Sequence, residues 1–170
     1  MAHYRMYTDG SFCDGSDITH GGIVFDGDNQ YKVHLYSRDP KFVSMRNVGG
    51  EVLAAWLAVF VAVENIKQEM KTSEGLQHHV VELVYDYNGV GCWLNGQWKC
   101  NKEGTAWYRD TIQKMISDVG CIELKLIHVK GHGTNEGNIE ADKVANFNME
   151  YAKSNGIQII DIDEIISKYT

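Results

Sequence analysis

The sequence predicts an α/β domain with a mixed five-stranded sheet, three antiparallel strands followed by two parallel ones, flanked by helices. Two observations predict this fold class. Three segments with strand-like patterns come first and are joined by short turns. Two further β-rich segments then alternate with long helical segments, as parallel strands joined by helical crossovers do. With 170 residues, 44% hydrophobic content and one proline, the chain can form one domain with a substantial core.

The first three strands are predicted from period-two patterns and turn residues. Residues 4–9 alternate between two faces until Gly10 and Ser11 break the pattern. Segments 18–27 and 30–38 follow, and the letters DGDN between them supply turn chemistry. We therefore expect an antiparallel meander.

The rest of the chain alternates helical and strand-like segments. Residues 51–71 are rich in strong helix formers and mostly apolar, so we expect a helix buried on one face of the sheet. Four more elements are expected: a strand at 78–89, a helix at 105–120, a strand at 121–131 and a long helix at 138–156. Residues 89–105 suggest a short helix and a loop, and for 157–170 a short docked helix is one interpretation.

Composition favours a cytoplasmic protein without a membrane segment. The N-terminal letters MAHYRMYTDG have neither the basic start nor the apolar core of a signal peptide. The longest apolar run, 52–63, is too short to span a bilayer. The four cysteines show no CxxC spacing and are expected to be reduced thiols. A net charge of −7 argues against a nucleic-acid partner, unless the acids gather around divalent cations.

Four acids and one histidine occupy positions that chemistry would use. Asp9 ends the first strand, Glu51 begins the first long helix, and Asp86 ends the fourth strand. Asp142 lies early in the last long helix, and His132 in the glycine-rich loop before it. Singly, each has a simpler explanation, such as a turn or the helix dipole. Carboxylates that converge, however, must protonate or bind cations, and a site of oxygen ligands suits Mg²⁺ or Mn²⁺.

These segments resemble a known family. The stretches YTDGS, RNVGGEVLAAWLAV, LVYDYNGV and VKGHGTNEGNIEADKVAN resemble, in this order, the active-site segments of ribonuclease H, type 1. The resemblance runs from about residue 4 to about residue 150, and His132 precedes Asp142 by ten residues as in the family. It implies the ribonuclease H fold, with a catalytic domain at 1–155 and a C-terminal extension of unknown role at 156–170.

The resemblance also implies an activity and a division of roles. It implies an endonuclease that hydrolyses the RNA strand of RNA/DNA hybrids with two Mg²⁺ ions, or Mn²⁺ as a substitute, and leaves 5′-phosphate and 3′-hydroxyl ends. Asp9 would bridge both ions, and Asp142 would complete the ion that holds the attacking water. Glu51 and Asp86 would hold the other ion, and His132 would assist proton movement or product release. We expect a monomer.

Substrate contacts are also implied, with departures from the family pattern. Asn47 and Asn88 match polar positions that read the minor groove of the hybrid, where 2′-hydroxyls distinguish RNA from DNA, and turn formation is their simpler explanation. Backbone amides around Gly10 and Ser11 would join them. Arg46 stands where many relatives have a threonine that helps to hold a DNA phosphate.

Two further departures concern a helix start and a basic segment. Gly49 and Gly50 precede Glu51 where bulkier residues are common, so the start of that helix is expected to be loose. Between 93 and 109, cations interleave with tryptophans, as in segments that follow a DNA backbone. They are Lys99, Lys102 and Arg109 with Trp93, Trp98 and Trp107. We expect at least two of these tryptophans to belong to the core.

Three alternatives to a ribonuclease H enzyme remain open at this point. A non-catalytic hybrid-binding or scaffold protein could keep the fold, although all four carboxylates are present. A junction resolvase or an exonuclease would share the first-strand aspartate, but not the His132 loop together with LVYDYNGV. A ribonuclease H module excised from a reverse transcriptase is the third.

Overall fold

The computed structural model describes residues 3–27, 31–72, 77–146 and 149–169 and contains one mixed sheet with helices on both faces. The strands are β1 (His3–Ser11), β2 (Thr19–Phe25), β3 (Tyr31–Ser37), β4 (His79–Tyr85), β5 (Ile122–His128) and β6 (Gln158–Asp161). The helices are α1 (Pro40–Val43), α2 (Asn47–Thr72), α3 (Gly89–Asn95), α4 (Glu103–Val119), α5 (Glu136–Ala145), α6 (Met149–Ser154) and α7 (Ile162–Ile166), followed by the 3₁₀ turn η1 (Ser167–Tyr169).

The sheet has the strand order β5-β4-β1-β2-β3-β6 and confirms the predicted fold class. β1, β2 and β3 form the expected antiparallel meander, and β4 and β5 run parallel to β1 and β4 respectively. The predicted count of five strands is wrong, because β6 pairs in parallel with β3 as a sixth strand. β6 has only four residues at the edge of the sheet, too few to show a period-two pattern. Gln30 of the predicted third strand and part of the DGDN turn lie outside the described residues.

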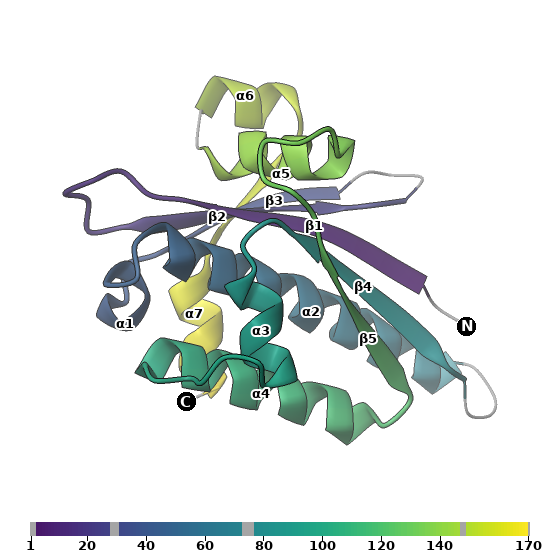
Figure 1. Ribbon diagram of the computed structural model, residues 1–170. Helices are drawn as coiled ribbons and strands as arrows, with labels where there is room; N and C mark the ends of the chain where they lie inside the picture. The colour runs from purple at the N-terminus through teal and green to yellow at the C-terminus, as the bar shows by residue number, and fades with distance from the viewer. Residues whose placement is uncertain (1–2, 28–30, 73–76, 147–148, 170) are drawn as a thin grey trace.

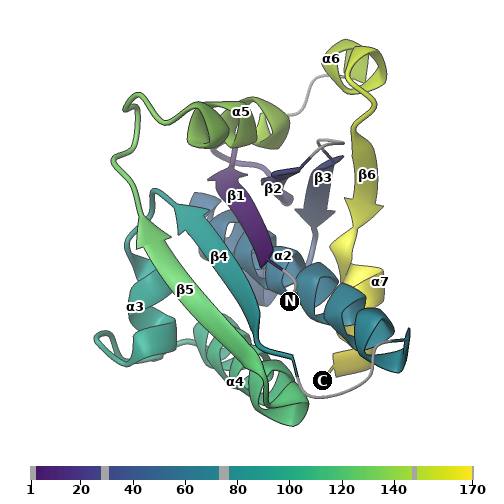
Figure 2. The ribbon, with the colours of Figure 1, turned by 90° about the vertical axis from the view of Figure 1, so that its right-hand side faces the viewer.

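Helices cover the two faces of the sheet unequally (Figures 1 and 2). α2, α4 and α7 lie on one face, whereas α5 and α6 lie on the other. α2 is the central helix of the core: its side chains are buried from Val52 to Val59. It alone, in the described part of the chain, is long and apolar enough to cross a membrane, with a mean hydropathy of 1.5 over its best window. That window is 78% buried inside the protein, as a core helix is.

The start of α2 is tighter than predicted. The helix begins at Asn47, four residues before the predicted start, and includes both glycines. A Cβ on Gly49 would lie 2.1 Å from the Phe42 carbonyl oxygen, and one on Gly50 would lie 1.9 Å from the His20 carbonyl oxygen. The expectation of a loose start is therefore wrong, since the two glycines are buried and permit close backbone packing.

The predicted long helix at 138–156 is two helices. α5 ends at Ala145, and Asn146 leaves the helical conformation with φ −79° and ψ 91°. α6 begins at Met149, while residues 147–148 lie outside the described residues. The apolar periodicity continues across this break, which is why the pattern alone predicted one helix.

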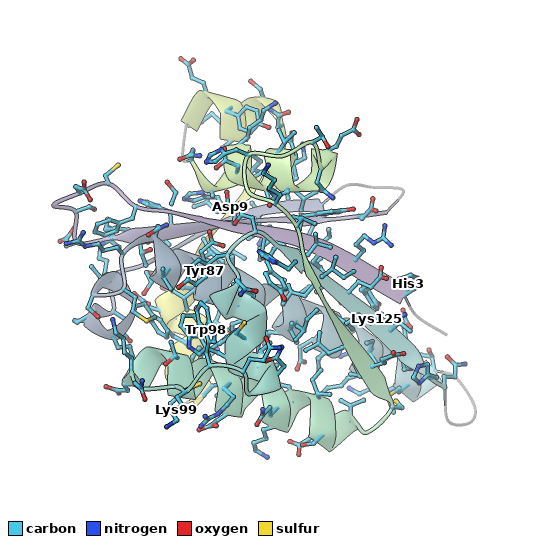
Figure 3. All side chains as sticks on the ribbon, viewed as in Figure 1. His3, Asp9, Tyr87, Trp98, Lys99 and Lys125 are labelled. Carbon is cyan, nitrogen blue, oxygen red and sulfur yellow. The ribbon has the colours of Figure 1, made fainter. Side chains whose placement is uncertain are left out.

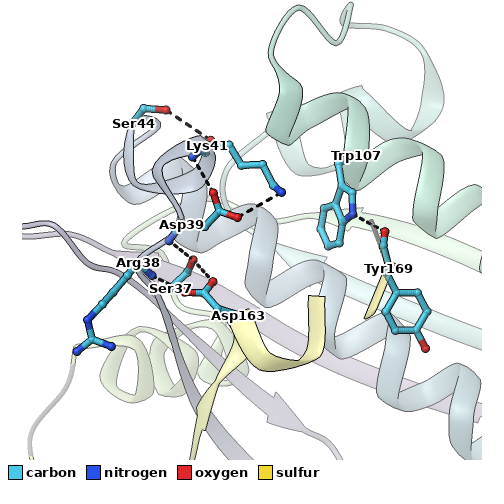
Figure 4. Close-up of polar contacts among 8 residues, drawn as sticks. All are labelled: Ser37, Arg38, Asp39, Lys41, Ser44, Trp107, Asp163 and Tyr169. Carbon is cyan, nitrogen blue, oxygen red and sulfur yellow. Dashed lines mark hydrogen bonds and ion pairs between the residues drawn. The ribbon is translucent and has the colours of Figure 1, made fainter. Parts of the chain in front are cut away.

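The C-terminal segment docks on the edge of the sheet and on α4 (Figure 4). Asp163 of α7 accepts hydrogen bonds from the Ser37 hydroxyl at 2.5 Å and from the Arg38 amide at 2.8 Å. The Trp107 indole N–H donates to the Tyr169 carbonyl oxygen at 3.0 Å. Ile162 of α7 is fully buried, so this segment contributes to the core.

Candidate active site

Three carboxylates meet where the parallel strands β1 and β4 end. Asp9 lies near the C-terminal end of β1, and Asp86 directly follows β4. Because β1 and β4 run parallel in adjacent positions, their ends reach the same edge of the sheet. Glu51 comes from the second turn of α2. One ligand atom of each of the three side chains lies within 4.8 Å of the others.

Gly10 allows α2 to bring Glu51 to Asp9. A Cβ on Gly10 would lie 2.4 Å from the Asn47 carbonyl oxygen and 2.5 Å from the Glu51 nitrogen. The first turn of α2 therefore lies directly against β1 at this point. The Gly10 amide also donates to the carboxylates of Asp9 and Glu51, which lowers their pKa.

Burial and mutual repulsion nevertheless raise the pKa values of the two innermost acids. Asp9 is 5% exposed and Glu51 4%. Burial above all, with a hydrogen bond to Asp142 and repulsion by Asp86, raises the pKa of Asp9 to about 7. Burial, and then Asp9, raises the pKa of Glu51 well above its usual range. Among the described residues, no cation forms an ion pair with the carboxylates of this cluster.

Asp142 and His132 lie beside the cluster. Asp142 is an exposed residue of α5 whose carboxyl comes within hydrogen-bonding range of Asp9. His132 lies in the loop before α5, and it lines one pocket together with Asp86 and Asp142. The structure thus brings together all five side chains singled out from the sequence. The role of each remains a prediction.

Two residues of this region have left-handed backbone conformations, which residues other than glycine rarely adopt. In the described ranges, Arg46 (φ 57°) and His132 (φ 56°) are the non-glycine residues with positive φ. Both are exposed, and both were predicted site residues. Backbone strain of this kind clusters at functional sites.

Sequence reasoning missed two residues that contact Asp86. The Asn138 amide nitrogen lies 3.4 Å from Asp86 Oδ2, and Asn138 is only 4% exposed. His128 Nε2 donates to the Asp86 carbonyl oxygen at 2.8 Å. The spacing of four residues between Asn138 and Asp142, one helical turn, was a signal that could have found the first.

The predicted minor-groove contacts surround the start of α2 and the end of β4. Asn47 is exposed at the first position of α2, and its carbonyl oxygen lies against Gly10. Asn88 is exposed at the N-cap of α3, and its side chain makes no capping hydrogen bond there. Ser11 ends β1, and its hydroxyl donates to Asn146 Oδ1 at 2.8 Å.

Lys99 lines a pocket with both polar and apolar side chains, beside an aromatic cluster of Tyr87, Trp93 and Trp98. The pocket is lined by Met45, Val48, Tyr87, Trp93, Lys99, Asn101, Lys102 and Thr105. The ring of Trp98 lies 5.6 Å from that of Trp93 and 6.2 Å from that of Tyr87. Asp9, Tyr87, Trp98 and Lys99 are labelled in Figure 3.

The tryptophan prediction is confirmed. Trp93 and Trp107 are partly buried and pack against the core, whereas Trp98 is 39% exposed. Arg109 pairs with Asp110 at 2.9 Å on α4 and does not line the pocket with Lys99.

Sequence comparison finds relatives among the bacterial ribonucleases H. No family model matches the chain. Ribonuclease HI of Rickettsia prowazekii is 28% identical over 143 residues, which cover 82% of this chain and 86% of that protein. Ribonuclease H of Rickettsia typhi is 29% identical over 143 residues, with the same coverage.

Solved structures of ribonucleases H1 share the fold. RNase H1 of Halobacterium salinarum matches with a TM-score of 0.58 at 18% identity, over 85% of this chain and 96% of that one. LC11-RNase H1, determined in complex with an RNA/DNA hybrid, matches with a TM-score of 0.61 at 18% identity, over 88% of this chain and 99% of that one. This chain therefore has the ribonuclease H fold, and the relatives that its sequence matches are named ribonuclease HI and ribonuclease H.

Proposed function

We propose that this protein is a divalent-metal-dependent endonuclease that hydrolyses the RNA strand of RNA/DNA hybrids. The observation that carries the proposal is the convergence of Asp9, Glu51 and Asp86, which form no ion pair with a cation in the part of the chain that the structure describes. Their place at the ends of β1 and β4 on a ribonuclease H fold, and the sequence relatives named ribonuclease HI, support it further.

The donor set fits hard divalent cations. It consists of carboxylate oxygens, the ligands that Mg²⁺ and Mn²⁺ prefer. Glu51 Oε2 is buried without a hydrogen-bond partner among the described residues, an arrangement that a cation would satisfy. In the proposal Asp9 would help to hold both of two ions, with Asp142 as a further ligand of one and Glu51 and Asp86 as further ligands of the other. Two Mg²⁺ ions held there would supply an activated water and stabilisation of the leaving oxygen, consistent with 5′-phosphate and 3′-hydroxyl ends.

The protein's own groups position the substrate and move protons. His132, exposed in its loop, can carry a proton to or from the cleaved phosphodiester. Asn47, Asn88 and the backbone amides near Gly10 would hold the minor groove, where 2′-hydroxyls mark the RNA strand. These contacts would select a hybrid over duplex DNA.

The DNA strand would lie on the pocket beside Trp98. Lys99 and Lys102 at this pocket can contact phosphates, and Tyr87 and Trp93 offer apolar contact to sugars. Arg46 would add a further phosphate contact. With so few cations, binding of the hybrid should be weak and should depend only modestly on salt.

The remaining predictions concern the whole chain. The predicted site residues lie within residues 1–155, which we propose as the catalytic part, with 156–170 as an extension at the far edge of the sheet. A monomer in the cytoplasm is the proposed state.

The test compares the parent protein with Asp86→Asn on an end-labelled RNA/DNA hybrid, with and without Mg²⁺. Asp118→Asn, an exposed aspartate paired with Lys114 on α4, is the matched control. We expect internal cleavage of the RNA strand alone, dependent on Mg²⁺, in the parent and in the control. The rate should fall at least about 10³-fold in Asp86→Asn, as for loss of a group that stabilises charge in the transition state.

Binding separates the outcomes. Asp86→Asn should still bind the hybrid in a filter-binding assay, because the substitution leaves the protein's contacts to the sugar-phosphate backbone of the hybrid unchanged. A parent protein that binds the hybrid but cleaves neither strand would contradict the enzyme and favour a scaffold. Cleavage of single-stranded RNA or of both strands at equal rates would contradict the proposed substrate.

A further inference from the structure

Three contacts hold the body of α5, which carries Asp142, on the sheet. A Cβ on Gly22 of β2 would lie 2.4 Å from a backbone nitrogen of α5, so the helix lies in direct contact with the strand. Lys32 of β3 pairs with Glu140 at 2.8 Å. His34 Nδ1, also on β3, lies 2.8 Å from the Val144 carbonyl oxygen. These contacts place the helix backbone but not the exposed Asp142 side chain.

Asn146 contacts Asp142 at the end of α5. The side-chain nitrogen Nδ2 of Asn146 donates to the Asp142 backbone carbonyl oxygen at 2.8 Å and to the Asp142 carboxylate oxygen Oδ1 at 3.2 Å. Its amide oxygen accepts the Ser11 hydroxyl at 2.8 Å. Ser11 lies two residues beyond Asp9 on β1. A polar bridge therefore runs from the strand of Asp9 to the carboxylate of Asp142.

The bridge has one favourable orientation. If the Asn146 side-chain amide were reversed, its oxygen would face the Asp142 carboxylate without a donor between them, and also the Asp142 carbonyl oxygen, which already accepts the Asn146 backbone N–H at 3.0 Å. The Ser11 hydroxyl could donate or accept, so the acceptors of Asp142 decide the orientation in which the nitrogen faces Asp142. Ser11 then donates to the amide oxygen and ties the side chain to β1. Ser11 thus acts on Asp142 through Asn146.

We propose that Asn146, anchored to β1 by Ser11, is a positioning residue that holds the Asp142 carboxylate toward Asp9 for metal binding; the inference rests on the proposed function. Asp142 is exposed and faces other carboxylates, so repulsion would turn a free side chain toward solvent. A hydrogen bond to Oδ1 opposes this rotation. It leaves the other carboxylate oxygen available to a cation.

The first test measures Mn²⁺ affinity of the full chain without substrate, by isothermal titration calorimetry. Asn146→Ala should weaken Mn²⁺ binding about three- to tenfold, the size of one lost hydrogen bond of ordinary strength. Asn155→Ala is the matched control, because the Asn155 side-chain amide makes the same kind of bond, at 2.9 Å to the Tyr151 carbonyl oxygen, but directly after α6 and not on α5. This control should bind Mn²⁺ like the parent.

The second test asks whether Ser11 acts through Asn146. Ser11→Ala should weaken Mn²⁺ binding in the parent but add nothing in Asn146→Ala, and Ser11→Thr, which keeps the hydroxyl, should preserve affinity. Without metal, the side-chain amide resonances of Asn146 should move in Ser11→Ala, while those of Asn155 stay. Additive effects of the two alanines, or unmoved Asn146 resonances, would contradict the bridge.

Kinetic measurements separate the Mg²⁺ requirement from the KM for the hybrid, whereas a general loss of structure would change both. At saturating hybrid, Asn146→Ala should need more Mg²⁺ for half-maximal rate, whereas KM for the hybrid stays unchanged. Equal Mn²⁺ affinity of the parent and Asn146→Ala overturns the inference while the parent still cleaves hybrid. A parent that binds Mn²⁺ but cleaves no hybrid overturns the proposed function, and the same variants still test the bridge.

Discussion

The β1–β4 strand pair carries buried carboxylates in opposite electrostatic states at two places: the middle of β4, called here the Glu82 end, and the C-terminal end of β1, called the Asp9 end. At the Glu82 end, Glu82 accepts hydrogen bonds from Arg5 Nε at 2.7 Å and His3 Nε2 at 2.8 Å. At the other end, Asp9 faces Glu51 and other acids. Figure 3 shows His3 and Asp9 well apart along the sheet. Glu82 is 8% exposed and Asp9 5%, so their burial is similar.

The difference teaches that the two acids owe their charge states to different causes, hydrogen-bond partners for Glu82 and burial beside other acids for Asp9. Hydrogen bonds from Arg5, and then from His3, lower the pKa of Glu82, whereas burial among other acids raises the pKa of Asp9 to about 7. At the Glu82 end, the carboxylate charge is balanced by Arg5 and His3 and needs no bound ligand. Among the residues described, none pairs a positive charge with the acids of the Asp9 end, and a bound cation would supply one.

The two ends should also respond to pH with opposite sign. Because the pKa of Glu82 is lowered in the fold, its stabilisation is present above the unfolded pKa and is lost as pH falls through the folded pKa. Because the pKa of Asp9 is raised, the fold binds its proton more tightly than the unfolded chain does. The metal-free protein therefore loses stability as pH rises from the unfolded value of 3.8 to about 7.

The largest expected effect is on catalysis. Asp9→Asn should lower the rate of hybrid cleavage at least about 10³-fold, roughly 4 kcal/mol in the transition state, because the ligand shared by both ions is lost. Single-turnover cleavage of an end-labelled hybrid in Mg²⁺ measures it. Glu82→Gln should cleave like the parent, and an equal loss in both variants would remove the contrast between the two ends.

The next effect concerns the backbone contact under the acidic end. Gly10→Ala should destabilise the fold by about 2–4 kcal/mol, because the added methyl group meets the backbone of α2 and must displace it. The midpoint of urea unfolding measures this loss. An unchanged midpoint would show that α2 can move away from β1 without cost, and that Glu51 is not held by the fold.

Removal of charge at the acidic end should stabilise the metal-free protein. Asp9→Asn should raise the free energy of unfolding by about 2 kcal/mol at pH 8, less than the full pKa change implies because neighbouring acids share the relief. The gain should shrink toward zero at pH 4, where the parent is protonated. Urea unfolding in EDTA at both pH values measures it, and saturating Mg²⁺ should reverse the order by stabilising the parent.

The smallest effect is at the paired end. Glu82→Gln should lower the free energy of unfolding by about 1 kcal/mol at pH 7, because Arg5 is partly exposed and solvent screens the ion pair. The loss should shrink as pH falls below the unfolded pKa and disappear below the lowered folded pKa. Stabilisation of the fold by this variant at pH 7 would contradict the assignment of Glu82 as a satisfied carboxylate.

Much of the fold could be predicted because its patterns are local. The strands with regular alternation and the long apolar helix were found, and so was the order of elements. β6 was missed because four residues at an edge carry too little pattern. The break at Asn146 was missed because the apolar period continues beyond it, although the chain leaves the helix there.

The acidic site could also be predicted in outline. Asp9 and Asp86 lie at the ends of strands that must end at the same edge, and Glu51 and Asp142 lie in the second turns of helices near that edge. Asn138 was missed because an amide early in a helix has common explanations. Only its burial and its contact with Asp86 distinguish it.

The sequence by itself determined which oxygen-bearing side chains end which strands, and so the fold class and the edge at which they meet. Tertiary structure alone decided the partners and the charge states, because these depend on contacts between residues far apart along the chain. Arg5 meets Glu82 across 77 residues and Ser11 meets Asn146 across 135, and no local pattern encodes either distance. The raised pKa of Asp9 has the same origin, since burial and neighbouring carboxylates exist only in the folded chain.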